Sequence, residues 1–265
     1  MSDSFRQPRR ILLVALGALT IFYLVAPSLV IIPLSFTETR SLTFPPSGFS
    51  LQWYQRMFSE RQWSTGLVNS LEVAALTTVF ATVLGTLAAL GMSRGRFPGK
   101  NIANSVFVAP LIVPVVVIGV GMFAVFVRWR LSGSLPGLVL AHTALAVPFV
   151  VVNVASSLRT LDRNLELAAM NLGAGPGRTF LRITLPIILP GVFAGAIFSF
   201  ISSWDEVVVA IFLTTARFRT LPVEMWEQVK QVVDPTVAAV STTLMLVTTT
   251  LLFLAFVVRR QEPTR

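Results

Sequence analysis

Long apolar runs constrain this chain more than any other feature of its sequence. A helix needs about 20 apolar residues to cross a bilayer core roughly 30 Å thick. Five runs meet this length easily, namely residues 11–34, 67–92, 102–127, 138–158 and 237–258. A sixth run, 187–213, is long enough but contains Trp204, Asp205 and Glu206. The sequence therefore predicts an all-α polytopic membrane bundle of six transmembrane helices.

The composition excludes a soluble domain. Hydrophobic residues make up 54% of the 265 residues and charged residues only 12%, whereas a soluble domain carries about 25% charged residues. The chain contains no cysteine, which excludes structural disulfides and thiolate metal sites. We therefore expect one integral-membrane domain with the lipid bilayer as its main surroundings.

The basic residues are concentrated in alternate loops. If the N-terminus is cytoplasmic, the segments on that side hold 13 of the 21 Lys and Arg residues and only four of the 12 acids, so the whole net charge of +9 lies there. This matches the positive-inside rule and predicts that both termini are cytoplasmic. It also removes any reason to expect nucleic-acid binding. Arg9 and Arg10 precede a run too long for a cleavable signal peptide, which indicates a cytoplasmic anchor.

The first segment expected outside, 36–66, contains a short helical pattern. Its large apolar side chains recur at helical spacing at Trp53, Tyr54, Met57 and Phe58. This pattern favours an amphipathic helix lying at the membrane interface. Contact with an external partner protein is the alternative.

The polar stretch between the fourth and fifth runs predicts a short helix from about Asp162 to Leu172. Asp162 can cap its N-terminus, and Gly173 is a natural residue to end it. Glu166, Ala169, Met170 and Gly173 share one face by their spacing. A helix with small residues on that face suits insertion into a groove on another protein. A loop helix resting on the bilayer surface fits the spacing equally well.

The same stretch resembles the cytoplasmic-loop signature of binding-protein-dependent ABC transporter permeases. That signature reads EAA, three residues, G, nine residues, I, one residue, LP. The residues in register are Ala168, Ala169, Gly173, Ile183, Leu185 and Pro186, with Leu172 and Ala174 also as usual. Leu167 stands at the position of the signature glutamate, and the acid lies one place earlier at Glu166.

The resemblance covers roughly the last four-fifths of the chain. The segment 69–94 is similar to the one that opens the family's core, and 199–247 is most similar to spermidine/putrescine permeases. That subgroup also includes permeases for opines and aminophosphonates. The resemblance thus implies an ABC importer permease for a small cationic or zwitterionic solute, with a polyamine favoured.

The resemblance also implies the organisation and the partners of the chain. Residues 1–66 would form the N-terminal tail, first span and external loop, 67–258 the permease core with its signature loop at 159–186, and 259–265 a cytoplasmic tail. The residues implied in coupling to a cytoplasmic ABC ATPase dimer are Glu166, Ala168, Ala169, Gly173, Ile183, Leu185 and Pro186. An extracytoplasmic solute-binding protein and a second, different permease subunit would complete the assembly in the bacterial inner membrane.

The chain is not expected to be an enzyme or to hold a cofactor or metal. It has no GxxxxGK[ST] phosphate-binding loop. ATP and its magnesium ion would therefore be bound by the partner ATPase, as the resemblance implies.

Asp205 and Glu206, beside Trp204, are unusual inside an apolar run. An acid at the centre of a membrane helix costs roughly 2.5–3.5 kcal/mol, so such residues usually face a cavity. One interpretation is a cation-attracting station on the substrate pathway. The other is a pair at the outer interface, with Trp204 as an aromatic anchor. We favour the first because apolar residues continue beyond the pair. His142, the only histidine, favours a hydrogen-bonded helix-packing role over a proton relay.

Two alternatives belong to other functional classes. A secondary transporter would show inverted repeats with charges in paired halves, and these are not visible. An intramembrane hydrolase pairing His142 with a serine would need a strained nucleophile motif, which is also absent. ATP dependence of uptake would separate the first alternative from an ABC permease.

Overall fold

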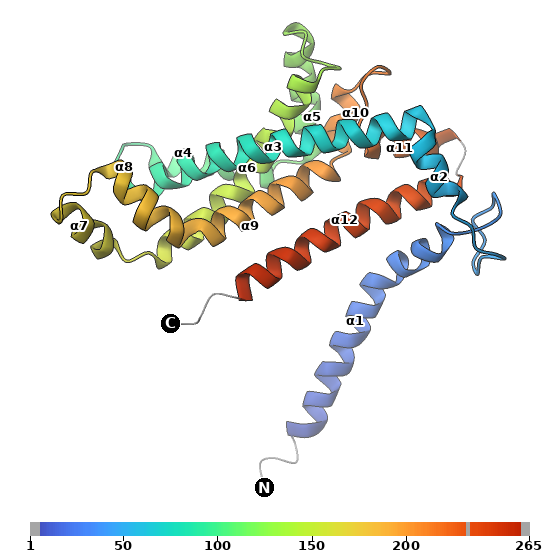
Figure 1. The fold of residues 1–265 in the computed structure, drawn as a ribbon, viewed down its shortest axis with the longest axis horizontal. Coiled ribbons are helices and arrows are strands. Elements are labelled where there is room, and N and C mark those ends of the chain that lie inside the picture. The colour runs from blue at the N-terminus through green and yellow to red at the C-terminus, as the bar shows by residue number, and fades with distance from the viewer. Residues whose placement is uncertain (1–5, 232–233, 261–265) are drawn as a thin grey trace. The chain divides into compact units, whose positions relative to one another are not determined.

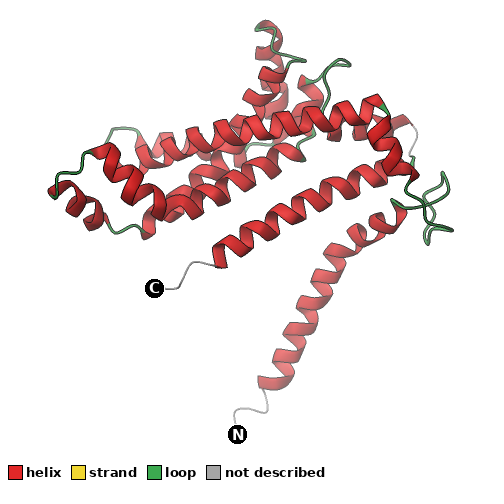
Figure 2. Ribbon diagram, in the orientation of Figure 1, coloured by secondary structure: helices red, strands yellow, loops and turns green. Residues whose placement is uncertain are grey.

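The computed structural model describes residues 6–231 and 234–260, which form helices joined by loops and contain no β-strand (Figure 2). Two compact units are present. The first comprises the residues up to Glu60 together with Glu227–Met245 and contains α1 (Arg6–Leu34) and α2 (Gln52–Ser59). The second comprises Arg61–Trp226 and the residues from Leu246.

The second unit holds most of the helices (Figure 1). They are α3 (Arg61–Arg94), α4 (Lys100–Val108), η1 (Ala109–Leu111), α5 (Val115–Arg128), α6 (Leu135–Thr160), α7 (Arg163–Asn171), α8 (Pro176–Thr179), η2 (Phe180–Thr184), α9 (Leu185–Trp204) and α10 (Val208–Leu213). Helices α11 (Leu221–Gln231) and α12 (Pro235–Arg260) each contribute residues to both units.

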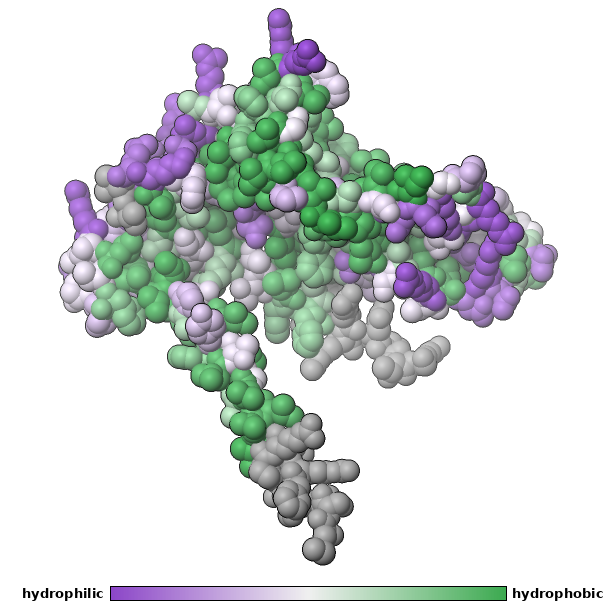
Figure 3. Space-filling view, turned by 180° about the vertical axis from the view of Figure 1, so that it is seen from behind, coloured by the Kyte–Doolittle hydropathy of each residue, from purple (hydrophilic) through white to green (hydrophobic). Residues whose placement is uncertain are grey.

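Five described helices are long and apolar enough to cross a membrane. They are Ile11–Leu34 of α1, α3, α6, the continuous segment Pro176–Trp204 and Pro235–Phe256 of α12. A bent pair, Lys100–Leu111 with Val115–Arg128, makes a sixth if both halves belong to one span. Hydrophobic residues cover much of the surface visible in Figure 3, and hydrophilic residues gather at its margins. The predicted all-α membrane bundle is confirmed.

We expected the run 102–127 to form one continuous helix, but it is broken. The chain turns by 101° between η1 and α5. Pro110 lies in η1, and Pro114, with φ −53° and ψ 124°, adopts an extended conformation just before α5. Each proline lacks an N–H group and disfavours a helical residue before it. Two prolines four residues apart therefore break the run.

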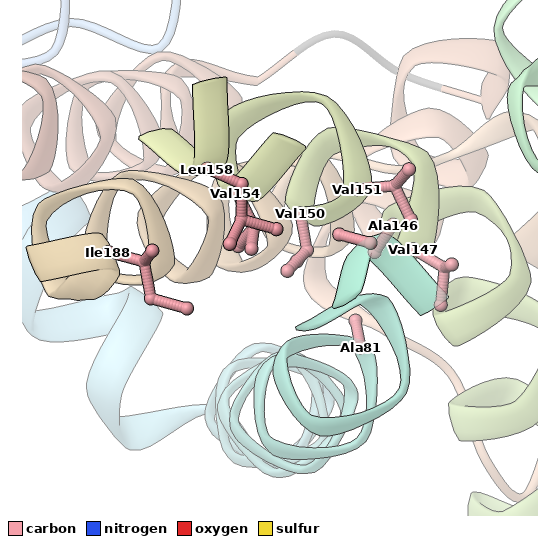
Figure 4. Close-up of a cluster of buried hydrophobic side chains, with 9 residues drawn as sticks. Ala81, Ala146, Val147, Val150, Val151, Val154, Leu158 and Ile188 are labelled. Carbon is pink, nitrogen blue, oxygen red and sulfur yellow. The ribbon is translucent and has the colours of Figure 1, made fainter. Parts of the chain in front are cut away.

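Helices α3, α6 and α9 pack together through small residues. The core between them contains Ala81, Ala146, Val147, Val150, Val151, Val154, Leu158 and Ile188 (Figure 4). A Cβ atom on Gly85 would lie 2.6 Å from Val150 Cβ, and one on Gly195 would lie 2.9 Å from Val150 Cα. Gly191 and Gly195 form a GxxxG pattern, which lets membrane helices approach closely. Glycines of α3 and α9 thus determine how closely these helices approach α6.

In the first unit, α2 has the predicted helical pattern but a different environment. Trp53 and Met57 are buried in the protein, and Trp53 Nε1 donates to the Thr37 carbonyl over 2.6 Å. Of the four apolar residues in the pattern, only Phe58 is largely exposed. Arg56 forms ion pairs with Glu60 and Asp234. The hydrogen bond with Glu60 raises the pKa of the Arg56 guanidinium despite its partial burial. The apolar face of α2 therefore packs mainly against protein.

Candidate functional site

The signature loop contains the short helix that its sequence predicts. In α7, the Asp162 side chain accepts a hydrogen bond from the Asn164 amide over 2.9 Å and caps the helix. Gly173 follows the helix with φ +86°, and its amide donates to the Met170 carbonyl over 2.9 Å. This left-handed conformation is one that glycine adopts without penalty. Both expected ends of the helix are confirmed.

Glu166 attaches α7 to the bundle. It is only 7% exposed, and its carboxylate pairs with the Arg94 guanidinium at the end of α3 and accepts a hydrogen bond from the Thr184 hydroxyl of η2. Arg94 also donates to Thr184 over 3.2 Å. The predicted face is therefore divided, because Glu166 points inward while Met170 and Gly173 are exposed. We call the side chains of Glu166, Arg94 and Thr184 the Glu166 cluster.

The outward surface of α7 and the residue after it combines apolar and polar side chains. The large apolar side chains exposed there are Leu165, Leu167, Met170 and Leu172, and the exposed polar ones are Arg163, Asn164 and Asn171. Leu172 is 90% exposed, and Ala168 beside it is also exposed. Leu167, at the position where the signature has glutamate, belongs to this surface and not to the Glu166 cluster. Such a surface on a short projecting helix suits an apolar groove on a partner.

The second half of the signature lies in a continuous helical segment. Ile183 belongs to η2, a π-helical turn, and Leu185 and Pro186 begin α9. A proline ring clashes with the carbonyl four residues earlier in a regular α-helix. The wider turn before Pro186 relieves that clash at Arg182. The structure brings Glu166 to this turn, but Ala168 and Gly173 lie on exposed parts of α7 and its end.

We expected the acidic pair to lie within one helix spanning 187–213. It lies instead in a break between two helices. Helix α9 ends at Trp204 and α10 begins at Val208. The Glu206 carboxylate accepts hydrogen bonds from the amides of Val209 and Ala210, both over 3.0 Å, and so caps α10. An acid directly before an apolar run is a helix-start signal, and that signal was available in the sequence.

Buried polar contacts fix this break against α6. His142 Nδ1 lies 2.8 Å from Ser203 Oγ in α9, and His142 Nε2 lies 3.9 Å from a Glu206 carboxylate oxygen. The hydrogen bond between α6 and α9 is the contact we favoured for His142. Trp204 is only 1% exposed and stacks on Phe200 with ring centroids 5.8 Å apart. Trp204 is therefore enclosed by protein.

A cavity of about 450 Å³ lies beside the break. Its lining residues are Phe149, Phe198, Ile201, Ser202, Asp205, Glu206, Val207 and Val208. Non-helical backbone at membrane depth is tolerated where it lines a cavity, and Asp205, Glu206 and Val207 of the break line this one. Sequence reasoning identified the acids but missed Phe149 and Phe198, because their proximity depends on how α6 and α9 pack.

The described residues contain no group of three or more His, Cys, Asp or Glu side chains that could hold a metal ion.

Comparisons with known proteins agree with this architecture. The chain is 34% identical to the putrescine transport system permease protein PotI of Escherichia coli K12 over 244 residues, which cover 89% of this chain and 85% of PotI. It is 31% identical to the spermidine/putrescine transport system permease protein PotC of Haemophilus influenzae, over 91% of this chain and 93% of PotC.

A solved bacterial ABC transporter that imports alginate has the same fold. One of its chains superposes with a TM-score of 0.73, covering 100% of this chain and 99% of that chain at 15% identity. Residues 81–263 match the family described as binding-protein-dependent transport system inner membrane component. With this match and the two permease relatives, the chain belongs to the family of inner membrane components of binding-protein-dependent transport systems, the permease subunits of ABC importers.

Proposed function

We propose that this chain is a permease subunit of a polyamine importer and that α7 couples it to a cytoplasmic ATPase dimer. The coupling role is supported by how α7 is attached to the bundle and by which of its side chains are exposed. Glu166 anchors the helix to α3 and η2, while Leu165, Leu167 and Leu172 remain exposed on it. A helix that is fixed through Glu166 and exposes large apolar side chains to a partner would transmit the partner's movement to the bundle.

The direction of transmission follows from the attachment points. Arg94 ends α3, and Thr184 belongs to the turn that continues into α9. Both helices pack on α6 through glycines. A displacement of α7 would therefore reach the three central helices, including the end of α9 where Asp205 lies. ATP and magnesium belong to the ATPase, and this chain requires no cofactor for that role.

Polyamine as the substrate is supported by two independent observations. The relatives PotI and PotC are named for putrescine and spermidine/putrescine transport. The cavity beside the α9–α10 break contains two carboxylates and no basic residue in its lining. A cationic solute fits that charge, and weak attraction permits release during transport. Opines and aminophosphonates are the alternative substrates, and both carry acidic groups.

The assembly also includes a solute-binding protein outside and a second permease subunit. A bacterial alginate ABC transporter has been solved in complex with an alginate pentasaccharide-bound periplasmic protein, which supports a partner of this kind. In our proposal both termini and α7 face the cytoplasm, and α2 faces the outside.

Uptake of radiolabelled putrescine and spermidine by cells expressing the complete transporter tests the substrate. We expect saturable uptake that requires ATP hydrolysis by the partner subunit. Uptake that follows an ion gradient and survives inactivation of the ATPase would instead indicate a secondary transporter. Import of an opine or an aminophosphonate without polyamine uptake would replace the substrate class and leave the permease role intact.

The absence of cysteine allows a clean test of orientation and docking. A membrane-impermeant maleimide should label a Leu167→Cys variant only from the cytoplasmic side and a Phe58→Cys variant only from outside. Assembly with the ATPase should protect the cysteine at position 167 from labelling, because α7 would lie in the partner's groove. Equal labelling at position 167 with and without the ATPase would contradict docking through α7.

A further inference from the structure

We propose that the cavity beside the α9–α10 break is an amine-binding site in which Asp205 contacts an ammonium group while Phe149 and Phe198 hold the adjoining methylene chain. This inference rests on the proposed import of polyamines and deepens it. It assigns different roles to the two neighbouring acids and adds an aromatic wall.

Asp205 and Glu206 differ in what their carboxylates already bind. Both Glu206 oxygens are engaged, since one accepts from the Val209 amide and the other from the Ala210 amide. The Glu206 side chain is also only 9% exposed and lies near His142. Asp205 is exposed, and no side-chain hydrogen bond or ion pair joins its carboxylate to another residue within 6–231 and 234–260. Asp205 is therefore the acid available to a ligand, and Glu206 is a positioning residue that holds the break.

Phe149 and Phe198 supply the aromatic part of the lining. Phe149 comes from α6 and Phe198 from α9, and their ring centroids lie 6.4 Å apart with planes inclined by 15°. The face of an aromatic ring attracts a cation within about 6 Å of its centroid and also packs well against methylene groups. The two rings therefore suit a ligand that is cationic at its end and aliphatic along its length.

The rest of the lining narrows the ligand class. Ile201, Val207 and Val208 are apolar, and Ser202 supplies one hydroxyl group. The volume of about 450 Å³ falls within the range of about 300–1,000 Å³ common for small-molecule sites. A solute with its own carboxylate or phosphonate would be repelled by Asp205 and would find no basic partner in the lining. The site therefore favours a primary amine on an alkyl chain over an opine or an aminophosphonate.

Four variants in the complete transporter test this assignment. Asp205→Asn removes the charge with little change in size, and Asp205→Glu restores it. Phe198→Leu keeps apolar bulk without a ring. Phe193→Leu is its control, because Phe193 lies on the same helix but lines a separate hollow with Pro186, Leu189 and Pro190.

The readout is the KM for putrescine uptake, with binding-protein-stimulated ATPase activity as the measure of assembly. A hydrogen bond to a charged group contributes about 1.5–3 kcal/mol, so Asp205→Asn should raise the KM about tenfold or more. Asp205→Glu should recover most of that change. Phe198→Leu should raise the KM about threefold to tenfold, and Phe193→Leu should match the wild type.

The outcomes separate this inference from the proposed function. If the wild type imports putrescine and Asp205→Asn does so with an unchanged KM, the amine site is wrong while the polyamine permease stands. The same holds if Phe193→Leu and Phe198→Leu have equal effects. If the wild-type transporter imports no polyamine, the proposed substrate itself fails. Should Asp205→Asn lose stimulated ATPase activity, competition of unlabelled putrescine with uptake in the Phe198→Leu and Asp205→Glu variants still decides the assignment.

Discussion

Removing the Glu166 carboxylate should detach α7 from the bundle without unfolding the bundle itself. In the Glu166→Ala variant, the hydroxyl of buried Thr184 and the guanidinium of Arg94 both lose their shared acceptor. A hydrogen bond to a charged group contributes about 1.5–3 kcal/mol. The Arg94 side chain is 40% exposed, so water replaces part of the loss on that side. We therefore expect about 2 kcal/mol, or about a 30-fold shift towards detached α7.

Hydrogen exchange on the assembled transporter measures this shift directly. Amides of residues 163–172 should exchange about 30 times faster in Glu166→Ala than in the wild type, while amides of α6 should be unchanged. Glu166→Gln keeps one acceptor oxygen and should show a smaller change. Glu72→Ala removes an exposed carboxylate of α3 and serves as the control.

Transport and ATP hydrolysis give the functional readout. If α7 transmits movement, Glu166→Ala should hydrolyse ATP yet import substrate poorly, because the partner would move a helix that is no longer fixed to α3 and η2. Wild-type exchange rates at residues 163–172 together with full uptake would refute the anchoring role of Glu166. Faster exchange with full uptake would retain the anchor and refute its part in coupling.

Three further perturbations follow from packing, backbone conformation and buried polarity. Gly85→Ala should destabilise the solubilised protein by about 1–3 kcal/mol in thermal melting, since the added Cβ would overlap Val150. The control Gly91→Ala should leave the stability unchanged, because open space surrounds Gly91. Equal melting curves for the two variants would contradict the close packing at Gly85. Gly173→Val should impair coupled uptake because φ is +86° at this position. Gly173→Asn should retain most of the uptake, since asparagine tolerates that conformation. An equal loss of uptake in both variants would indicate that side-chain size matters there and not backbone conformation. His142→Ala should lower stability by about 1–3 kcal/mol by leaving the Ser203 hydroxyl buried without its partner, and a melting temperature equal to that of the wild type would show that the contact contributes nothing.

The helix α7 could be read from local sequence because its ends are determined locally. The Asp162 cap and the Gly173 turn each involve residues within a few positions along the chain. The environment of Glu166 could not be read in the same way. Its partners are 72 and 18 residues away, and only the packing of α3 and η2 against α7 turns it inward.

The helix breaks show a different limit. Hydropathy reports whether residues prefer lipid, and it correctly identified 102–127 and 187–213 as apolar. It does not report whether the backbone continues as one helix. The prolines at 110 and 114 were a sequence signal for the first break, as was an acid before an apolar run for the second.

The sequence by itself determined the membrane class, the all-α architecture and the permease family, because these depend on apolar length and on a spaced motif within one loop. The tertiary structure decided which polar groups are engaged and which are free. It buried Glu166 beside Arg94 and placed Phe149 of α6 near Phe198 of α9. Those relations join residues far apart in the chain. Only helix packing fixes them, and local composition does not record it.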